Sequence, residues 1–494
     1  MLYKAKDRVT EDYDVIVVGS GLAGMTAANK MAKDGMKVLL LEAHNKLGGF
    51  ATWFFRQNKD HVFDVSLHGF PFGMKKTCRK YWNKNIADHI VQLKDVRFIN
   101  PEYNIQSSFT REDFTDKLVN NFKVDIVTVN SFYNYIESMN FYDNKHMTNR
   151  DLFQKFFPDR NDITRFLMEP IVYANGSTLD DPAISYGIVF SNFMSKGVYT
   201  FKGGTDVIIK MMREELLSNN VDIKMHSKIE KIVIEGGITK GVMLKDDFIK
   251  SKAVLSNANI RSTIINMAGA ENFSESFIKK TKDIRMNSSS CQVYMGIRPG
   301  ETIPHIGDLV FTSTHPTFDS EALLDMNITS RTFSVYYPEG RPYDENPRYC
   351  IVSSTNANYS DWNDLAEEEY KAEKEKMIEE TLVCLEKYIP DIRNKIDFVD
   401  AATPRTVKKF VHHESGTSFG TKFEGLDVSM NLHKEVDGLF HAGSVGIIMS
   451  GWLGAANYGV IQSNEIASYL YKLDKDEQIK TESNSKNDQG AIHV

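Results

Sequence analysis

A glycine-rich turn close to the N-terminus most constrains what this chain can fold into. Gly19–Gly24 matches the pattern G-x-G-x-x-G and directly follows Asp14–Val18, a short and largely β-branched run typical of a buried parallel strand. After the turn, Leu22–Asp34 predicts a helix and Lys37–Glu42 predicts a second strand. Strand, glycine turn, helix and strand in this order predict a βαβ unit that binds a dinucleotide.

The residues of this turn have distinct tasks in such a unit. Gly19 permits the tight turn, Gly21 lets a pyrophosphate approach the backbone, and Gly24 allows the helix to pack closely on the strand. Leu22 and Ala23 open the helix, whose free N–H groups and dipole favour negatively charged phosphates. We therefore expect one half of a dinucleotide to be held here.

An acidic residue and a second glycine pair extend this site. Glu42 ends the second strand at about the spacing of 20 residues expected for an acid that binds ribose hydroxyls, and its carboxylate disfavours a 2′-phosphate. Gly48 and Gly49 mark a second place where the backbone passes close to a large group. Near the C-terminus, Ser450–Ala456 predicts a helix start whose N–H groups face the electron-rich edge of a reduced isoalloxazine. Together these features favour FAD over NAD.

The remaining patterns predict a discontinuous organisation. Residues 104–192 are aromatic-rich and helical, strand patterns resume between residues 221 and 257, and Asp364–Tyr388 predicts a long charged helix. We predict an α/β fold in which a Rossmann-type FAD-binding domain carries an inserted α+β substrate domain. The expected pieces are 1–75, 200–285 and 400–474 for the FAD-binding domain, 76–199 and 286–399 for the substrate domain, and 475–494 for a polar, disordered tail.

Composition narrows the partners and the compartment. A net charge of −7 without basic clusters argues against nucleic acid as a partner. The four cysteines are widely spaced and form no CxxC pair, which indicates free thiols in a reducing compartment. We see no secretory signal and expect a cytoplasmic protein. The uncharged stretch Gly438–Asn464 has no sustained run of about 18 apolar residues, so no transmembrane helix is predicted there.

A metal site is not expected. His412, His413 and Glu414 are adjacent in the sequence, but neighbouring side chains on a strand point to opposite faces. A third ligand at a suitable spacing is missing from the pattern.

Together these patterns resemble the phytoene desaturase and carotenoid isomerase group of FAD enzymes. This group is a branch of the flavin amine oxidase-like superfamily that also contains retinol saturase. The resemblance covers most of the chain, and its first and last motifs are specific for FAD in this fold. It rests on Gly19–Gly24 with Glu42, Gly48–Gly49 followed by Phe63–Asp64, Gly203–Gly204 before a helix, Val254–Ala258, Thr403–Thr406 and Gly438–Gly454.

The resemblance implies which residues hold FAD, and where this chain departs from its relatives. The sequence departs from them at Phe50, where a polar residue often follows the glycine pair. It departs again at Asp64–Gly69, where Ser66 replaces a glycine and His68 follows; this pattern is more similar to the retinol saturase-like members than to typical desaturases. The implied FAD contacts are Gly19, Gly21, Leu22, Ala23, Gly24 and Glu42 for the ADP half, Ile229 for the adenine, Gly48, Gly49 and Phe50 beside the pyrophosphate and flavin, and Gly443, Ser444, Leu453 and Gly454 around the ribityl and flavin end.

The resemblance further implies an oxidoreductase acting on carbon–carbon bonds of a lipophilic isoprenoid or polyene. Desaturation, saturation and cis–trans isomerisation by hydride exchange with flavin N5 all stay open. His68 is the candidate for proton transfer, because a histidine titrates near neutral pH. A lipophilic substrate predicts peripheral contact of the inserted domain with a membrane. An amine oxidase-type enzyme that oxidises a C–N bond and a non-catalytic flavoprotein are the alternatives, and the oligomeric state is left open.

Overall fold

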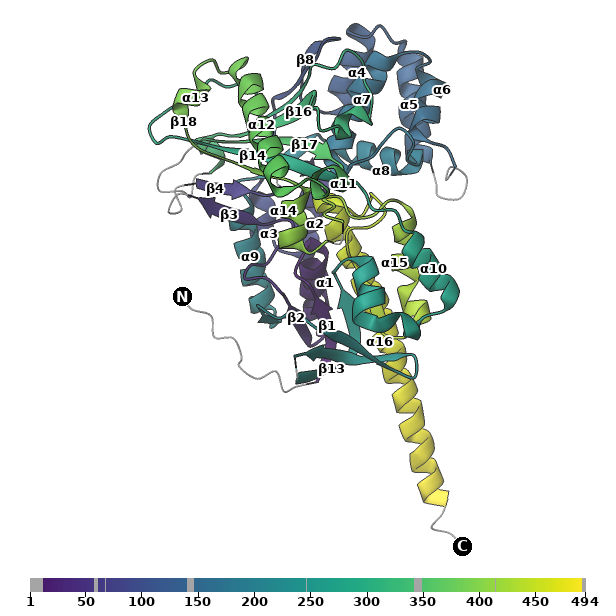
Figure 1. Ribbon diagram of the computed structural model, residues 1–494. Helices are drawn as coiled ribbons and strands as arrows, with labels where there is room; N and C mark the ends of the chain where they lie inside the picture. The colour runs from purple at the N-terminus through teal and green to yellow at the C-terminus, as the bar shows by residue number, and fades with distance from the viewer. Residues whose placement is uncertain are drawn as a thin grey trace.

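The computed structural model describes residues 12–56, 61–66, 68–139, 146–245, 247–341, 349–413 and 415–490. Two large sheets organise these residues. One lies in the lower part of the molecule around β1 (Tyr13–Val18), and the other lies in the upper part around β14 (Ser289–Ile297), as Figure 1 shows. Helices pack on both sheets, so the fold is of the predicted α/β class.

The lower sheet contains the predicted βαβ unit. Its other strands are β2 (Val38–Leu41), β10 (Asp222–Lys224), β11 (Lys231–Glu235), β12 (Ile238–Leu244), β13 (Asp247–Ser256) and β19 (Leu439–His441). The order is β10-β2-β1-β13-β12-β11, and β19 pairs with β13. Strands β10, β2, β1, β13 and β19 run parallel, whereas β12 and β11 are antiparallel. All residues of β2 are buried, which explains its unbroken apolar pattern.

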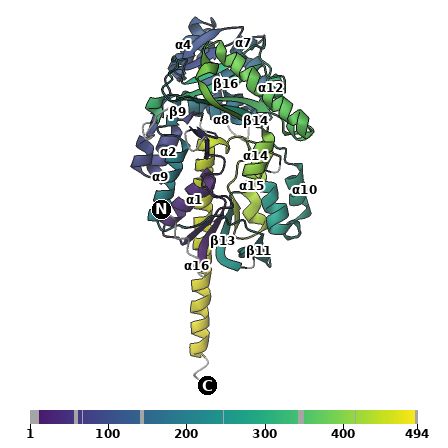
Figure 2. The ribbon, with the colours of Figure 1, turned by 60° about the vertical axis from the view of Figure 1, so that its left-hand side comes forward.

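Two helices that begin at the same end of this sheet pack on each other. They are α1 (Leu22–Lys33) and α16 (Gly451–Gly490). A Cβ added at Gly459 would lie 2.3 Å from the carbonyl oxygen of Ala23, so the glycine allows the two backbones to approach closely. Figure 2 shows α16 running down the lower half of the molecule and projecting beyond it. The other helices around this sheet are α2 (Gly73–Tyr81), α3 (Lys84–Asp88), α9 (Thr205–Ser218), α10 (Glu275–Asp283) and α15 (Glu424–Glu435).

The upper sheet is built mainly from later parts of the chain. Its other strands are β7 (Val96–Ile99), β8 (Asn104–Ser107), β15 (Leu309–Ser313), β16 (Ser330–Tyr336), β17 (Cys350–Ala357) and β18 (Ile396–Ala402). The order is β18-β14-β17-β16-β15-β7-β8. A hairpin of β3 (Trp53–Arg56) and β4 (His61–Asp64) and a small sheet of β5 (Phe70–Pro71), β9 (Val198–Phe201) and β6 (Ile90–Gln92) complete the strands of the described residues.

Helices cover the two faces of the upper sheet unequally. The aromatic-rich region forms α4 (Arg111–Asn120), α5 (Ile126–Ser138), α6 (Asn149–Phe156), α7 (Asn161–Asn175) and α8 (Ala183–Met194). Leu309 and Phe311 pack with these helices, whereas Val310 packs on the opposite face with α12 (Glu367–Glu386). Because side chains alternate between the two faces of a strand, the upper sheet separates two hydrophobic cores, one against α4–α8 and the other against α12. The short helices α11 (Tyr359–Asn363), α13 (Ile392–Lys395) and α14 (Pro404–Val411) lie beside them.

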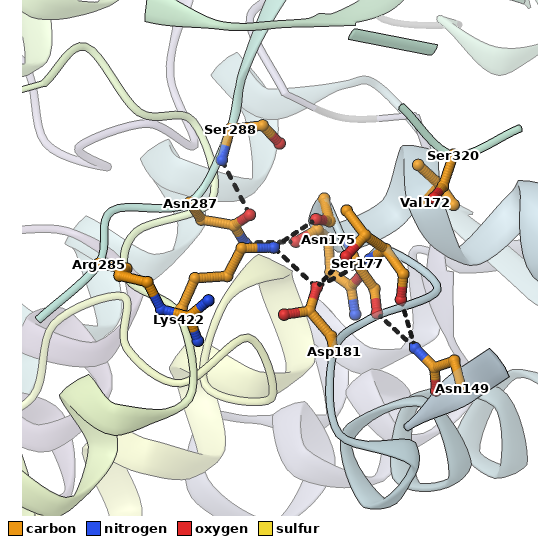
Figure 3. A network of polar contacts seen from close by, with 12 residues as sticks. Asn149, Val172, Asn175, Ser177, Asp181, Arg285, Asn287, Ser288, Ser320 and Lys422 are labelled. Carbon is orange, nitrogen blue, oxygen red and sulfur yellow. Dashed lines mark hydrogen bonds and ion pairs between the residues drawn. The ribbon is translucent and has the colours of Figure 1, made fainter. Parts of the chain in front are cut away.

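A buried polar network ties the end of α7 to the chain that leads back to the lower sheet (Figure 3). Lys422 Nζ lies 2.7 Å from Asp181 Oδ2 and 3.3 Å from the carbonyl oxygen of Gly176. Asn287 Nδ2 donates to the carbonyl oxygen of Asn175 at 2.9 Å. Charged and polar groups at this depth require such partners, so the network holds α7 in one position.

The segment that carries Lys422 also supports the loop before α16. Thr421 N donates to the carbonyl oxygen of Ser444 at 3.2 Å, and Ser450 Oγ donates to that of Phe419 at 2.6 Å. The end of α7 and the start of α16 are therefore fastened to one segment.

Two local expectations are wrong. The chain after Asp474 continues as α16 to Gly490 instead of being disordered, and neither proline nor glycine interrupts the helix between Gly459 and Gly490. His412 and His413 follow helix α14 instead of lying on a strand. Glu414 lies outside the described residues.

The described ranges contain neither a metal-binding cluster nor a membrane-spanning helix. No group of three or more His, Cys, Asp or Glu side chains in these ranges is placed to hold a metal ion. No helix in the same ranges is both long enough and apolar enough to cross a membrane.

Candidate functional site

A large cavity lies between the two sheets. Its volume is about 1570 Å³, which exceeds the roughly 300–1,000 Å³ typical of a pocket for one small molecule. Its lining begins at the carboxyl ends of β1 and β2 and reaches the upper sheet, α7 and α8. The space therefore suits a dinucleotide and a second ligand together.

The cavity brings together residues predicted from distant parts of the sequence. Gly24 is the exception, because it lies beneath the turn, where an added Cβ would be 2.3 Å from the carbonyl oxygen of Gly19. This position matches its expected task of close packing. The predicted site residues that line the cavity are Gly19, Gly21, Leu22, Ala23, Glu42, Gly48, Gly49, Phe50, His68, Ile229, Gly443, Ser444, Leu453 and Gly454.

Glu42 is hydrogen-bonded to the Gly19–Gly24 turn through Ser20. Its Oε2 accepts hydrogen bonds from Ser20 N at 2.9 Å and from Ser20 Oγ at 2.5 Å. Its Oε1 accepts one from His44 N at 2.7 Å. The side chain is 9% exposed, so these bonds replace the water that the carboxyl group loses at the edge of the cavity.

We expect the substitution Glu42→Gln to lower the free energy of unfolding by about 1.5–3 kcal/mol, because it removes the charge that three donors share. Ser20→Ala removes one of these donors and should cost about 1 kcal/mol. Chemical denaturation of the two variants measures both values. If the free energy of unfolding of Glu42→Gln lies within about 0.5 kcal/mol of the wild-type value, these bonds contribute little.

Asn257 is a residue of the site that sequence reasoning did not single out. It follows β13, and its backbone N–H donates to the carbonyl oxygen of Val18 at 2.7 Å. Its Nδ2 donates to the carbonyl oxygen of Ala442, and a Cβ added at Gly21 would lie 2.5 Å from its Oδ1. Asn257 thus connects the glycine turn to the loop after β19. Its place after a parallel strand next to β1 was the available signal, because ligands bind at the carboxyl ends of such strands.

The second predicted helix start also lies at the cavity. The first turn of α16, Gly451–Gly454, lines the cavity. Trp452 Nε1 donates to the carbonyl oxygen of Ser66 at 3.3 Å and so ties this turn to the segment that carries His68. The first N–H groups of a helix have no partner within the helix, so the cavity receives donors from both α1 and α16.

His68 lies between the cavity and the upper sheet. Gln292 Oε1 accepts the hydroxyl proton of Tyr294, which leaves Gln292 Nε2 to donate to His68 Nε2 at 2.9 Å. His68 Nδ1 then carries the proton and donates to Ser334 Oγ at 3.0 Å. This assignment of the amide and the tautomer follows from the direction of the hydrogen bonds.

Burial lowers the pKa of His68 to about 4, although the charge of Asp64 opposes the shift. The imidazole is therefore neutral at physiological pH and accepts a hydrogen bond at Nε2. Proton donation by His68 at neutral pH, as expected from an ordinary histidine, does not fit this environment.

This shift predicts an acid-sensitive contribution to stability. The unfolded chain protonates His68 near pH 6.5, whereas the folded protein does so near pH 4. The contribution of neutral His68 to the free energy of unfolding is therefore complete above pH 6.5 and is lost as the pH falls through 4. We expect the stability difference between the wild type and His68→Gln to shrink by about 2–3 kcal/mol between pH 7 and pH 4 in urea unfolding. Parallel pH curves for the two proteins would contradict the shift.

The chain has the flavin amine oxidase-like fold, in which a parallel sheet with a dinucleotide turn is joined to a second sheet. Residues 17–84 match the model of the NAD(P)-binding Rossmann-like domain. Cyclohexylamine oxidase from Brevibacterium oxydans has this fold with a TM-score of 0.63 at 12% identity, over 93% of this chain and 100% of the other.

Two curated relatives are similar in sequence along most of the chain, and a third is similar over a short stretch. Prolycopene isomerase of Daucus carota is 23% identical over 93% of this chain and 81% of its own length. The 4,4'-diapophytoene desaturase of a Methylomonas species is 21% identical over 82% of this chain and 84% of its own length. All-trans-retinol 13,14-reductase of Danio rerio is 48% identical over 61 residues, or 12% of this chain and 10% of its own length. The predicted resemblance is confirmed, and the chain is an enzyme of the oxidoreductase class.

Proposed function

We propose that the protein is an FAD-dependent oxidoreductase that acts on a carbon–carbon bond of a lipophilic isoprenoid or polyene. The observation that carries the proposal is the continuity of the cavity. It runs from the glycine turn after β1, past the start of α16, to apolar side chains of α7 and α8 such as Ile171 and Val189. The names of the curated relatives support a polyene as the substrate class.

The residues of the chain fit FAD. The first turn of α1 would bind the pyrophosphate, Glu42 would bind the ribose, and Ile229 would contact the adenine. A carboxylate at Glu42 repels a 2′-phosphate, which disfavours NADP. The start of α16 would hold the flavin end. When bound, FAD supplies a centre that accepts or donates a hydride at N5.

The chain itself orients the substrate and excludes water. Side chains of α7 and α8 hold an apolar chain in a dry space, where a small change of position strongly affects the rate. His68 is neutral, holds Gln292 and Ser334 in place on the cavity wall through its two ring nitrogens, and does not supply a proton. This assigns His68 a positioning role.

The proposal also divides the chain and places it at a membrane. The FAD-binding domain comprises 1–75, 200–285 and 400–474, and the substrate domain comprises 76–199 and 286–399.

Ile126 and Val127 at the start of α5 are 44% and 67% exposed, and they are our candidates for contact with a lipid surface. Co-sedimentation with liposomes tests the contact, and the double variant Ile126→Ser, Val127→Ser should reduce it. Equal sedimentation of both proteins would contradict this part.

A spectroscopic experiment tests the proposed reaction. The purified protein should show the visible absorbance of bound flavin, and anaerobic incubation with a polyene panel should bleach it. If the protein works with reduced flavin, the same panel after dithionite treatment should restore the colour. Bleaching by amines instead would assign the chain to C–N oxidation, which the fold shared with cyclohexylamine oxidase keeps as the alternative. Absence of flavin after reconstitution would overturn the proposal.

A further inference from the structure

One wall of the cavity is unexpectedly polar for a site that takes a hydrocarbon. Side chains alternate along the strands of the upper sheet, so every second residue faces the cavity. On β14 these residues are Ser290, Gln292 and Tyr294, and on β17 they are Ser354 and Asn356. Their neighbours in sequence, such as Val293 and Ile351, pack with α12 on the other face.

The polar residues of this wall retain unused hydrogen-bonding capacity. Asn356 Nδ2 donates to the carbonyl oxygen of Val172 at 3.0 Å, while its Oδ1 has no partner among the described residues. Ser354 Oγ makes one contact, of 3.3 Å, with His68 Nε2. Both residues are at most 9% exposed. A purely apolar ligand would displace water from these groups and replace it with nothing.

A second wall has the reverse character. It is formed by α7 and α8 and presents Ile171, Ala174, Ile188, Val189 and Phe193 to the cavity. The cavity is therefore amphipathic, because an apolar wall of helices adjoins a polar wall of strands.

The polar wall is built for an uncharged group. Ser290, Gln292, Tyr294, Ser354 and Asn356 carry no charge. At the edge of this wall lies Asp400, whose carboxylate is already 2.9 Å from Lys374 Nζ and 3.6 Å from Arg56 Nη2. An ammonium or carboxylate on the ligand would have to compete with these pairs.

We propose that the substrate is an apolar chain that carries an uncharged hydrogen-bonding group, a hydroxyl or a carbonyl, which binds Ser354 and Asn356 on the β17 wall. An unsubstituted hydrocarbon is a poor ligand. This inference rests on the proposed function, since it names the kind of polyene that the site accepts. Ser354 and Asn356 are then specificity-determining residues, because a site built to bond a hydroxyl discriminates strongly against the analogue that lacks it.

A matched pair of ligands tests the proposal. The pair consists of a C20 polyene that ends in a primary hydroxyl and the same polyene that ends in a methyl group. Trp53 and Trp452 line the cavity, so quenching of tryptophan fluorescence reports binding without reference to turnover. We expect the alcohol to bind the flavin-loaded protein at least about 10-fold more tightly than the hydrocarbon, which corresponds to the loss of one hydrogen bond.

Variants on one strand provide the internal control. Ser354→Ala removes a hydroxyl from the cavity face, whereas Ser353→Ala removes one from the opposite face of β17. Ser354→Ala should weaken binding of the alcohol about 5- to 10-fold and leave binding of the hydrocarbon unchanged, and Ser353→Ala should change neither. Asn356→Leu should have the same selective effect as Ser354→Ala. Because Ser354→Ala deletes one atom, it keeps the test valid if Asn356→Leu does not fold.

The possible outcomes separate the two proposals. If both polyenes bind equally and Ser354→Ala changes nothing, the polar-group proposal is overturned while the proposed function stands. If neither polyene binds and neither changes the flavin spectrum, the proposed function fails, and the substrate class falls with it.

Discussion

The substitution Gly24→Val should yield a folded protein that does not retain the cofactor. Even the first added carbon would lie 2.3 Å from the carbonyl oxygen of Gly19 and 3.1 Å from Cβ of Asn257. Backbone atoms cannot move aside as a flexible side chain can, so the glycine turn and α1 must separate. The phosphates then lose the converging N–H groups, and we expect FAD affinity to fall at least about 100-fold.

The ratio of released flavin to protein, together with far-ultraviolet circular dichroism, measures this effect. Gly340→Ala is the matched control, because nothing lies within 4 Å of its added Cβ, and it should retain flavin like the wild type. Stoichiometric flavin in Gly24→Val with unchanged affinity would refute the packing argument.

Removal of the Arg341 guanidinium should destabilise the junction between the two sheets by about 3–5 kcal/mol. Arg341 Nη2 donates to Asp64 Oδ2 at 2.7 Å, and Asp64 is fully buried on β4. Asp64 Oδ1 accepts hydrogen bonds from Thr205 N at 2.9 Å and Oγ1 at 2.5 Å at the start of α9. Arg341→Met leaves this buried carboxylate without its cation, and it also removes the cation that lies 3.6 Å from the partly exposed carboxylate of Asp206.

Urea unfolding at neutral pH measures the loss. Arg150→Met is the control, since the pair of Arg150 with Asp180 is well exposed and should contribute less than about 1 kcal/mol. The double variant Asp64→Asn, Arg341→Met removes one of the stranded charges and should regain part of the stability. An Arg341→Met variant as stable as Arg150→Met would show that the buried pair is not what joins the sheets.

Burial raises the pKa of Asp206 to about 6, and the Arg341 charge limits this rise. The folded protein therefore binds a proton at Asp206 more tightly than the unfolded chain does. Its contribution to stability is present below pH 4 and is lost as the pH rises through 6. In Arg341→Met the loss should extend to higher pH, which separates this effect from that of His68 in the same titration.

Local rules were sufficient to predict the nucleotide half of the fold. The pattern around Gly19–Gly24 involves a strand, a turn and a helix that are contiguous, so sequence spacing alone places them in space. The strand Asp14–Val18 and the helix that follows Gly203–Gly204 were predicted for the same reason and form β1 and α9. Gly451–Gly454 was recognised by its lack of charge and its helix-start pattern.

Other parts of the site depend on contacts that spacing does not encode. Asn257 gains its place through the pairing of β13 with β1, and His68 gains its low pKa from a wall built by strands far along the chain. The sequence near His68 does not reveal that Gln292 and Ser334, which are far away along the chain, contact its ring. The polar face of β14 and β17 was missed for the same reason. Alternation of polar and apolar residues shows that a strand has two faces, but it does not show what each face contacts.

The lower sheet takes its strands from three separated stretches, and this arrangement constrains when the cofactor can enter. During synthesis β1 and α1 leave the ribosome first, whereas β13 and β19, which complete the sheet beside β1, follow much later. Until then one edge of β1 has no strand to pair with, and an unpaired edge is prone to aggregate or to recruit a chaperone. Closing so long a loop is slow, and the start of α16 comes last of all. The flavin that we propose for this site would therefore join a nearly finished chain.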